Sequence, residues 1–249
     1  MRIITKGLIV REQHNGENDR IVTVLTRDKG IVRAFASGAR RLQHKNSIGT
    51  QLLCYSDLTL FRGKDSYRVD EAAPIEVFFA LRGDIVKLSL AQYFCELARL
   101  LCPEESEAEQ PLRLILCALK FLCDDAYPPD QIKAVTELRL MVLSGYMPDL
   151  VGCAVCGGNE GEVLYLDLVG GLVYCSNHRA SAPEPGMLAP LPAGVFAAMR
   201  HIIYSDFAKV FRFTLPEESM RLLSSTTERY VRAQVGRSFG TLDFYRSLL

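Results

Sequence analysis

Short apolar runs with partial two-residue alternation dominate the first 80 residues. These runs are rich in Ile and Val and span residues 3–11, 20–27, 30–37, 51–62 and 66–78. Tight-turn signals separate neighbouring runs, namely Asp28-Lys29-Gly30 and the segment from Arg62 to Asp65. A small open sheet would leave exposed edges, so these five strands predict a closed barrel.

Helical periodicity replaces the alternation after residue 80. Apolar residues then recur at spacings of mainly three and four, which is typical of amphipathic helices. We expect helices over residues 81–101, 111–123, 129–144, 192–204 and 216–235. The predicted fold class is therefore α+β, with a barrel domain over residues 1–80 and a helical domain over residues 81–249. A segment over residues 153–178 interrupts the helical domain.

Four potential metal ligands form two pairs in that segment. Cys153 and Cys156 make one pair, and eighteen residues separate it from Cys175 and His178. Two side chains three residues apart around a tight turn can face one tetrahedral ion, and this spacing is typical of structural zinc sites. The intervening residues predict a hairpin that turns at Gly170-Gly171 and brings the pairs together. We therefore expect one structural Zn²⁺; ordinary buried thiols and a redox Cys-x-x-Cys are the alternatives.

The composition is that of an ordinary soluble globular protein. Of the 249 residues, 49% are hydrophobic and 23% are charged, which excludes a disordered or collagen-like chain. The first residues carry charges among their apolar positions and lack the apolar core of a signal peptide. We therefore expect a cytoplasmic protein, whose eight cysteines stay reduced as metal ligands or buried thiols.

Positive charge is concentrated in the first third of the chain, although the net charge is zero. Residues 1–80 hold thirteen Lys or Arg against nine Asp or Glu, whereas residues 81–150 hold seven against eleven. Because charges act over about 8 Å at physiological salt, a basic region can bind a polyanion even in a neutral protein. A polar, basic loop over residues 38–49 follows the third predicted strand. Its charge serves either to bind phosphates or to keep a solvated loop soluble.

The candidate nucleic-acid contacts lie on this loop, on the barrel strands and at a second turn. They are Lys29, Arg33, Arg40, Arg41, Lys45, Arg62 and Lys64. Phe35 or Tyr67, if exposed on the barrel, would stack against bases.

Motifs of several common enzyme classes are missing. The sequence has no Gly-x4-Gly-Lys-Ser/Thr loop for ATP phosphates, no Gly-x-Ser-x-Gly turn and no His-Glu-x-x-His helix. A metal held by four protein ligands also lacks the open coordination position that a zinc hydrolase needs. We therefore expect a binding protein and not an enzyme. A zinc-ribbon scaffold that binds only proteins is the alternative to one that binds DNA.

Several short motifs resemble the RecO recombination-mediator family. They are Gly7-Leu-Ile-Val-Arg11, Gly16-Glu-Asn-Asp-Arg20, Gly38-Ala-Arg-Arg41, the Arg62-Gly63 turn, and Leu138-Arg-Leu leading to Gly145-Tyr-Met-Pro-Asp149 and Cys153. The succession of a helix, Gly-Tyr-x-Pro and two cysteines is the most specific of these features. Beyond His178 the chain matches the family only in its helical character and its ending.

The resemblance implies an OB-fold barrel followed by a helical domain that contains the zinc element. It implies a mediator of DNA repair and homologous recombination that binds single- and double-stranded DNA and anneals complementary strands without a nucleotide cofactor. The implied partners are RecR, single-strand-binding protein and RecA. With RecR, such a mediator helps to load RecA onto DNA that is coated with single-strand-binding protein. The implied location is the bacterial nucleoid. Arg40, Arg41 and Lys45 fall on the family's basic loop, and the four candidate ligands fall on its metal motif.

Overall fold

The structure, a computed structural model, describes residues 1–63, 66–159 and 161–249. Its contacts divide the chain into two units, the first formed by Met1–Ala126 with Phe239–Leu249 and the second by Tyr127–Ser238. The second unit is therefore an insertion between two segments of the first. The boundary predicted at residues 80 and 81 separates strands from helices, whereas the contacts group the first two helices and the last helix with the strands.

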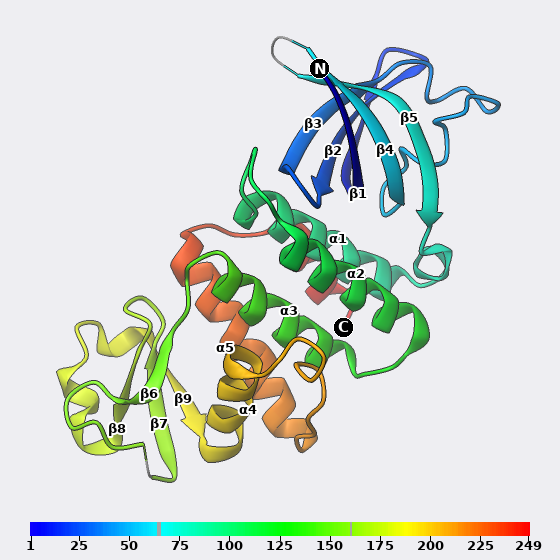
Figure 1. Ribbon diagram of the computed structural model, residues 1–249. Coiled ribbons are helices and arrows are strands. Elements are labelled where there is room, and N and C mark those ends of the chain that lie inside the picture. The colour runs from blue at the N-terminus through cyan, green and yellow to red at the C-terminus, as the bar shows by residue number, and fades with distance from the viewer. Residues whose placement is uncertain (64–65, 160) are drawn as a thin grey trace. The chain divides into compact units, whose positions relative to one another are not determined.

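Five strands close into a barrel at the start of the first unit (Figure 1). They are β1 (Arg2–Asn15), β2 (Asp19–Thr26), β3 (Gly30–Ala36), β4 (Tyr55–Arg62) and β5 (Tyr67–Glu76). The order around the barrel is β1-β2-β3-β5-β4, with β3 and β5 parallel and the other neighbours antiparallel. This arrangement confirms the prediction of a five-stranded OB-fold barrel. The fourth strand begins later than predicted, because residues 51–54 form turns.

Strand β1 joins β2 to β4 in the ring, because it pairs with one of them along each of its edges. Gly7 lies opposite Thr26 of β2 on one side and opposite Ser56 of β4 on the other. A Cβ at this position would lie 2.6 Å from a methyl carbon of Val24. Glycine therefore leaves room for side chains from both neighbouring strands, Val24 of β2 and Leu58 of β4.

Apolar side chains from all five strands fill the barrel. The buried cluster includes Ile9, Val22, Val24, Val32, Ala34, Leu58, Leu60 and Val69. On β2 and β3 these residues occupy every second position, so the residues between them point outward.

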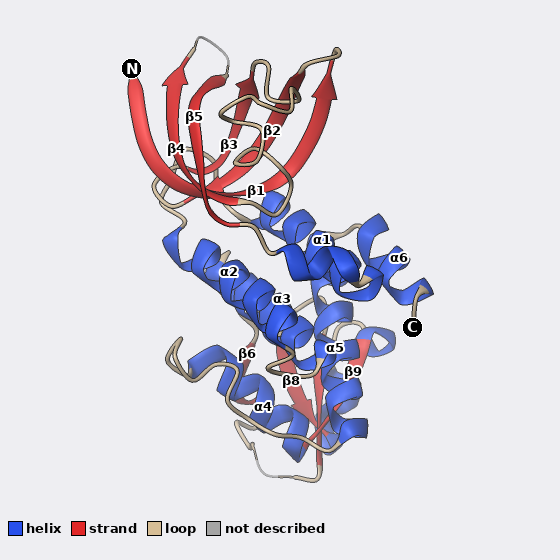
Figure 2. Ribbon diagram, turned by 90° about the vertical axis from the view of Figure 1, so that its right-hand side faces the viewer, coloured by secondary structure: helices blue, strands red, loops and turns tan. Residues whose placement is uncertain are grey.

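Three helices complete the first unit. They are α1 (Ile85–Leu101), α2 (Glu109–Asp124) and α6 (Gly240–Ser247). The carboxylate of Asp84 caps α1 by accepting hydrogen bonds from two N–H groups of its first turn. Helix α6, which was not predicted, packs against α1 (Figure 2). Phe239 meets the ring of Tyr93 edge-on at 5.6 Å, and the hydroxyl of Thr241 donates to Glu96.

The second unit combines three helices with a small sheet. Its helices are α3 (Pro129–Leu143), α4 (Ala193–Tyr204) and α5 (Glu217–Val235). Its strands are β6 (Asp149–Cys153), β7 (Val163–Asp167), β8 (Leu172–Cys175) and β9 (Leu188–Pro192), in the order β6-β8-β7-β9. The antiparallel pairing of β7 with β8 confirms the predicted hairpin. Short 3-10 helices span Phe79–Gly83, Ser176–Ser181 and Pro185–Met187. Within the described residues, no helix is both long and apolar enough to cross a membrane.

A buried ionic network joins α3 to α5. The ammonium group of Lys133 lies 3.1 Å from a carboxylate oxygen of Glu137 and 3.1 Å from one of Glu228. Thr227 donates a hydrogen bond to Glu137, and the Ser224 carbonyl accepts one from Lys133. These residues are almost wholly excluded from solvent, so each charge depends on its partners for solvation.

We expect Lys133→Met to destabilise the second unit by about 3–5 kcal/mol, because the buried carboxylates of Glu137 and Glu228 would lose the ammonium group that they share. Urea unfolding followed by circular dichroism measures this change. Arg221→Ala is the control, since its ion pair with Glu217 is exposed and should leave the unfolding midpoint unchanged. A Lys133→Met protein as stable as the control would show that the network contributes nothing to folding.

Candidate functional site

A β-bulge turns Arg11 to the outside of the barrel. In strict alternation, positions 9 and 11 of a strand face the same side, and Ile9 faces the buried core. Val10 is an extra residue, because Ile9 lies opposite Val24 of β2 whereas Arg11 lies opposite the adjacent Thr23. Arg11 is consequently exposed on the outer face.

Arg11, Thr23 and Arg33 form one row across the outer face of three strands, which we call the arginine row. Thr23 lies opposite Arg11 of β1 on one side and opposite Arg33 of β3 on the other. Since neighbouring strands lie about 4.8 Å apart, the two arginines start from positions about 10 Å apart. Both are exposed, so their guanidinium groups can reach one bound ligand from two sides.

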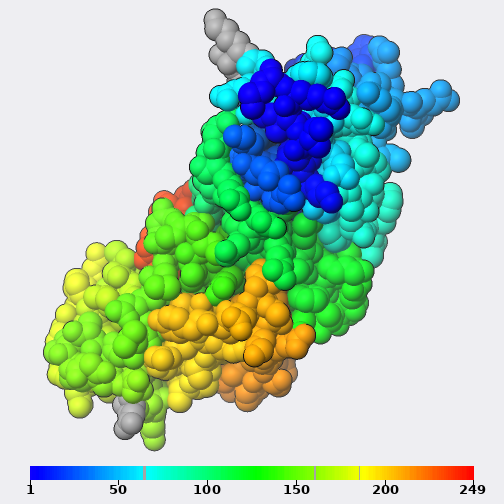
Figure 3. All heavy atoms as spheres, in the orientation of Figure 1, coloured from blue at the N-terminus to red at the C-terminus, as the bar shows by residue number. Residues whose placement is uncertain are grey.

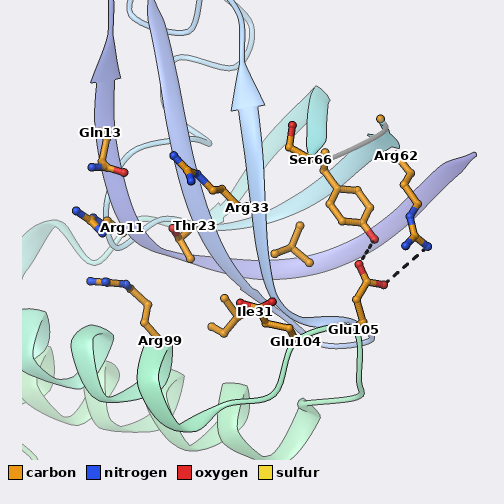
Figure 4. Close-up of a pocket in the computed structure, with 13 residues that line it drawn as sticks. Arg11, Gln13, Thr23, Ile31, Arg33, Arg62, Ser66, Arg99, Glu104 and Glu105 are labelled. Carbon is orange, nitrogen blue, oxygen red and sulfur yellow. Dashed lines mark hydrogen bonds and ion pairs between the residues drawn. The ribbon is translucent and has the colours of Figure 1, made fainter.

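The arginine row lines a pocket of about 610 Å³. Figure 4 shows the side chains of Arg11, Arg33 and Arg99 gathered at one side of this pocket, whereas Arg62 lies at the other side. Arg99 comes from α1 and Arg62 ends β4, so four arginines from separate elements meet here. Gln13, Thr23 and Ser66 add neutral polar groups to the lining.

The arginines of the pocket differ in their partners. Nη1 of Arg62 lies 4.0 Å from Oε2 of Glu105, whose other carboxylate oxygen accepts a hydrogen bond of 2.7 Å from the Tyr67 hydroxyl. No carboxylate of the described residues forms an ion pair with Arg11 or Arg33. Cations gathered in a partly enclosed site repel one another and attract an anion. The pocket is therefore suited to phosphate or carboxylate groups.

The four predicted metal ligands converge in the second unit. The sulfur atoms of Cys153, Cys156 and Cys175 and a ring nitrogen of His178 all lie within 4.8 Å of one another. Nδ1 of His178 is 3.7 Å from the sulfur of Cys153 and 3.2 Å from that of Cys175. Ligands of a tetrahedral zinc site with bonds of about 2.3 Å lie about 3.8 Å apart. The four side chains therefore fit around one ion.

The backbone around Cys153 prepares its thiol for a metal. Gly157 adopts a φ of +72°, and its N–H donates to the Cys153 carbonyl, which forms the tight turn that the spacing predicted. Burial alone would raise the pKa of the Cys153 thiol, but backbone N–H groups, including those of Cys156 and Cys175, lower it to about 6. The lowered pKa favours the thiolate form of Cys153, which is the form that binds metal ions.

Two family models match the chain in succession. The model described as recombination protein O N terminal matches residues 1–78, and the one described as recombination protein O C terminal matches residues 82–243. The chain belongs to the RecO family.

Relatives in this family match the chain over most of its length. The DNA repair protein RecO of Acetivibrio thermocellus is 32% identical over 244 residues, which cover 98% of this chain and 96% of that protein. The DNA repair protein RecO of Heliobacterium modesticaldum is 34% identical over 236 residues, which cover 92% of this chain and 84% of that protein. That of Symbiobacterium thermophilum is 27% identical, with 97% and 96% covered. These matches identify the chain as a RecO-family DNA repair protein.

The structure brings two of the predicted nucleic-acid contacts of this RecO-family chain into the pocket. Arg33 and Arg62 both line it. Lys29 lies at the turn between β2 and β3, outside the lining, and is half-buried. Lys64 lies outside the described residues. As DNA contacts, all of these residues stay predictions.

The basic loop lies at the other end of β3 from Lys29. Arg40 is anchored there, because its Nη1 donates to the Gly16 carbonyl at 2.9 Å. Arg41 and Lys45 are exposed, and the loop after β3 projects from the barrel surface (Figure 3). Apart from Lys29 and Lys64, the predicted contacts therefore form a pocket group and a separate loop group, and do not form one cluster.

One aromatic residue proposed for base stacking is not accessible. Tyr67 is only 7% exposed, because its ring belongs to the barrel core. Phe35 is half-buried on the outer face beside the arginine row. Phe35 lies opposite Arg68 of β5, which in turn lies opposite Phe61 of β4, and Phe61 is 37% exposed. Phe35 therefore stays a candidate stacking group, and Phe61 replaces Tyr67 as the second.

Sequence reasoning missed Arg11 and Arg99. Strict alternation from Ile9 would have placed Arg11 in the core, and Arg99 reaches the pocket only through the packing of α1. The pairing of Thr23 with Arg33, in contrast, could have been predicted from the sequence. Residues equally distant from a hairpin turn face one another, so the turn before Gly30 sets Thr23 opposite Arg33.

We expect the purified protein to carry about one metal ion per chain and Cys175→Ser to lose it, because the remaining three ligands no longer enclose the ion. Elemental analysis of protein prepared without chelator measures the content. Cys123→Ser is the control, since Cys123 lies outside the cluster. Folded wild-type protein without metal, or full retention by Cys175→Ser, would contradict the assignment.

Proposed function

We propose that this chain is a recombination mediator that binds single- and double-stranded DNA through its barrel. The observation that carries the proposal is the arginine row, which lies in a pocket on the outer face of the barrel and lacks carboxylate partners among the described residues. OB-folds bind oligonucleotides on the face formed by their second and third strands, and Thr23 and Arg33 stand on those strands. Membership of a DNA repair family supports a nucleic acid as the polyanion.

The proposed interface reads the sugar–phosphate chain and not the base sequence. Guanidinium groups of Arg11 and Arg33 bind phosphate oxygens, and the flanking Phe35 and Phe61 offer apolar faces to unstacked bases. The projecting loop with Arg41 and Lys45 adds phosphate contacts beyond the pocket. Stacking and phosphate contacts are tolerant of sequence, which is what a general repair protein requires.

Annealing then follows from electrostatics. Two complementary strands repel each other, and a cationic surface that screens both lets them sample registers until base pairing takes over. No covalent step and no nucleotide cofactor is needed, so the proposed mediator is not an enzyme.

The remaining parts of the proposal concern the partners and the metal. We propose that the chain acts with RecR in the bacterial cytoplasm, at the nucleoid, to help RecA replace single-strand-binding protein on DNA. We also propose that the metal is one Zn²⁺, since three thiolates and an imidazole are donors that this ion favours. Four protein ligands leave no position for a substrate, so the ion stabilises the fold and takes no part in chemistry.

Replacing both arginines of the row tests the interface. We expect Arg11→Gln with Arg33→Gln to weaken binding of a labelled oligonucleotide and to flatten the plot of log K against log salt by about 1.4, because two single-strand phosphate contacts are lost. Fluorescence anisotropy over a salt series measures both quantities. Arg212→Gln with Arg229→Gln is the control, since both residues are exposed in the second unit and the charge change is the same. Equal losses in the two double variants would show that net charge, and not the row, determines binding.

Reversing charge on the loop tests its part in annealing. We expect Arg40→Glu with Arg41→Glu to slow strand annealing without nucleotide, on bare DNA and on DNA coated with single-strand-binding protein, while the unfolding temperature stays nearly constant. Unchanged annealing would remove the loop from the interface. If the wild-type protein showed no salt-sensitive DNA binding, the chain would be a scaffold that binds only proteins.

A further inference from the structure

The segment between α1 and α2 lies along the wall of the proposed DNA-binding pocket. We call residues 103–107 the acidic strap. Its acidic residues are Glu104, Glu105 and Glu107. The strap is attached to the β2–β3 hairpin at its start, where the Ile31 N–H donates to the Pro103 carbonyl at 2.8 Å. The chain is attached again directly after the strap, where the Ala108 N–H donates to the Arg27 carbonyl at 2.8 Å.

The backbone is shaped to hold the strap against the barrel. A Cβ at position 30 would lie 1.9 Å from the Pro103 carbonyl oxygen, so only the glycine found there permits this approach. Gly30 also adopts a φ of +58°, which other residues avoid. Glu105 itself adopts a φ of +54°, an unusual conformation for a residue with a side chain. A strained position of this kind persists only where surrounding contacts hold it.

The contacts of the Glu105 side chain supply that restraint. Its carboxylate accepts a hydrogen bond of 2.7 Å from the Tyr67 hydroxyl and lies 4.0 Å from the guanidinium of Arg62 (Figure 4). Burial and then the bond to Glu105 raise the pKa of the Tyr67 hydroxyl above its usual value, which favours the protonated form that donates this bond. The carboxylate is therefore aimed into the pocket by one residue and paired there with another.

Glu104 and Glu105 line the same pocket as the arginine row. Arginine binds carboxylate and phosphate through the same forked geometry, so a carboxylate beside Arg62 stands where a phosphate would bind. We propose that the acidic strap is an internal competitor: Glu105 holds Arg62 when DNA is absent, and a phosphate of the bound strand displaces it. This inference rests on the proposed function, since it assumes that the pocket binds DNA.

The strength of the pair suits such an exchange. The side chains of Arg62 and Glu105 are 54% and 45% exposed, and exposed ion pairs contribute little because water and salt screen them. A strand that also contacts Arg11 and Arg33 can therefore displace the carboxylate, whereas an isolated anion gains much less. The strap then favours long polyanions over small anions at this site.

Neutralising Glu105 tests the competition. Glu105→Gln keeps an acceptor for the Tyr67 hydroxyl but removes the charge that holds Arg62. We expect a single-stranded oligonucleotide to bind about two- to fivefold more tightly to this variant in fluorescence anisotropy. In an Arg62→Gln background the same substitution should change affinity little, because the residue that it releases is gone. Glu107→Gln is the matched control, since it changes the charge of the strap equally but lies outside the pocket lining.

Each other outcome contradicts one of the two proposals. No gain from Glu105→Gln, an equal gain from Glu107→Gln, or a gain that persists without Arg62 would overturn the strap proposal. The proposed function would survive all three if the wild-type protein still binds DNA and loses affinity when the arginine row is neutralised. Absence of salt-sensitive binding in the wild-type protein and in every variant would overturn both.

Discussion

Closure of the barrel by β1 is the constraint on which the proposed binding face depends. This strand pairs along both edges, with a glycine where side chains of both neighbours crowd it and a bulge at Val10. The bulge that bends the strand also reverses the direction of the side chains after it. A regular strand would direct the Arg11 guanidinium into an apolar core, which is costly for an unpaired charge. The same local feature therefore completes the fold and exposes a cation.

The two units use charge in opposite ways. In the second unit, Lys133 is buried, and carboxylates of Glu137 and Glu228 surround it, so its charge is satisfied within the fold. On the barrel, Arg11 and Arg33 stay exposed, and the described residues offer them no ion pair. A buried pair fixes how helices pack, whereas an exposed cation retains its attraction for an external anion. The chain therefore has a net charge of zero although the outer face of its barrel is cationic at the arginine row.

Features with a local cause were predictable, and features with a distant cause were not. The β2–β3 hairpin follows from its turn, and the metal cluster follows from ligand spacing and from the hairpin between the pairs. The parallel pairing of β3 with β5 involves only two residues on each strand, and α6 is held by Phe239 against Tyr93, so neither feature leaves a periodic signal. Of the four arginines that line the pocket, only Arg33 and Arg62 were among the predicted nucleic-acid contacts, for the same reason. Arg33 and Arg62 lie beside recognisable turns, whereas Arg99 enters from another element.

An annealing protein faces a physical limit on how tightly it binds DNA. Strands must exchange registers before the correct one forms, so a surface that traps the phosphates of one register would slow the search. Counterion release makes each further phosphate contact strengthen binding by a multiplicative factor, so affinity rises steeply with the number of free cations. On the proposed function, the Glu105 carboxylate pairs with Arg62 again whenever a phosphate dissociates, which keeps the number of free cations low. The pocket then binds phosphates weakly and reversibly, and base pairing between the two strands determines which register persists.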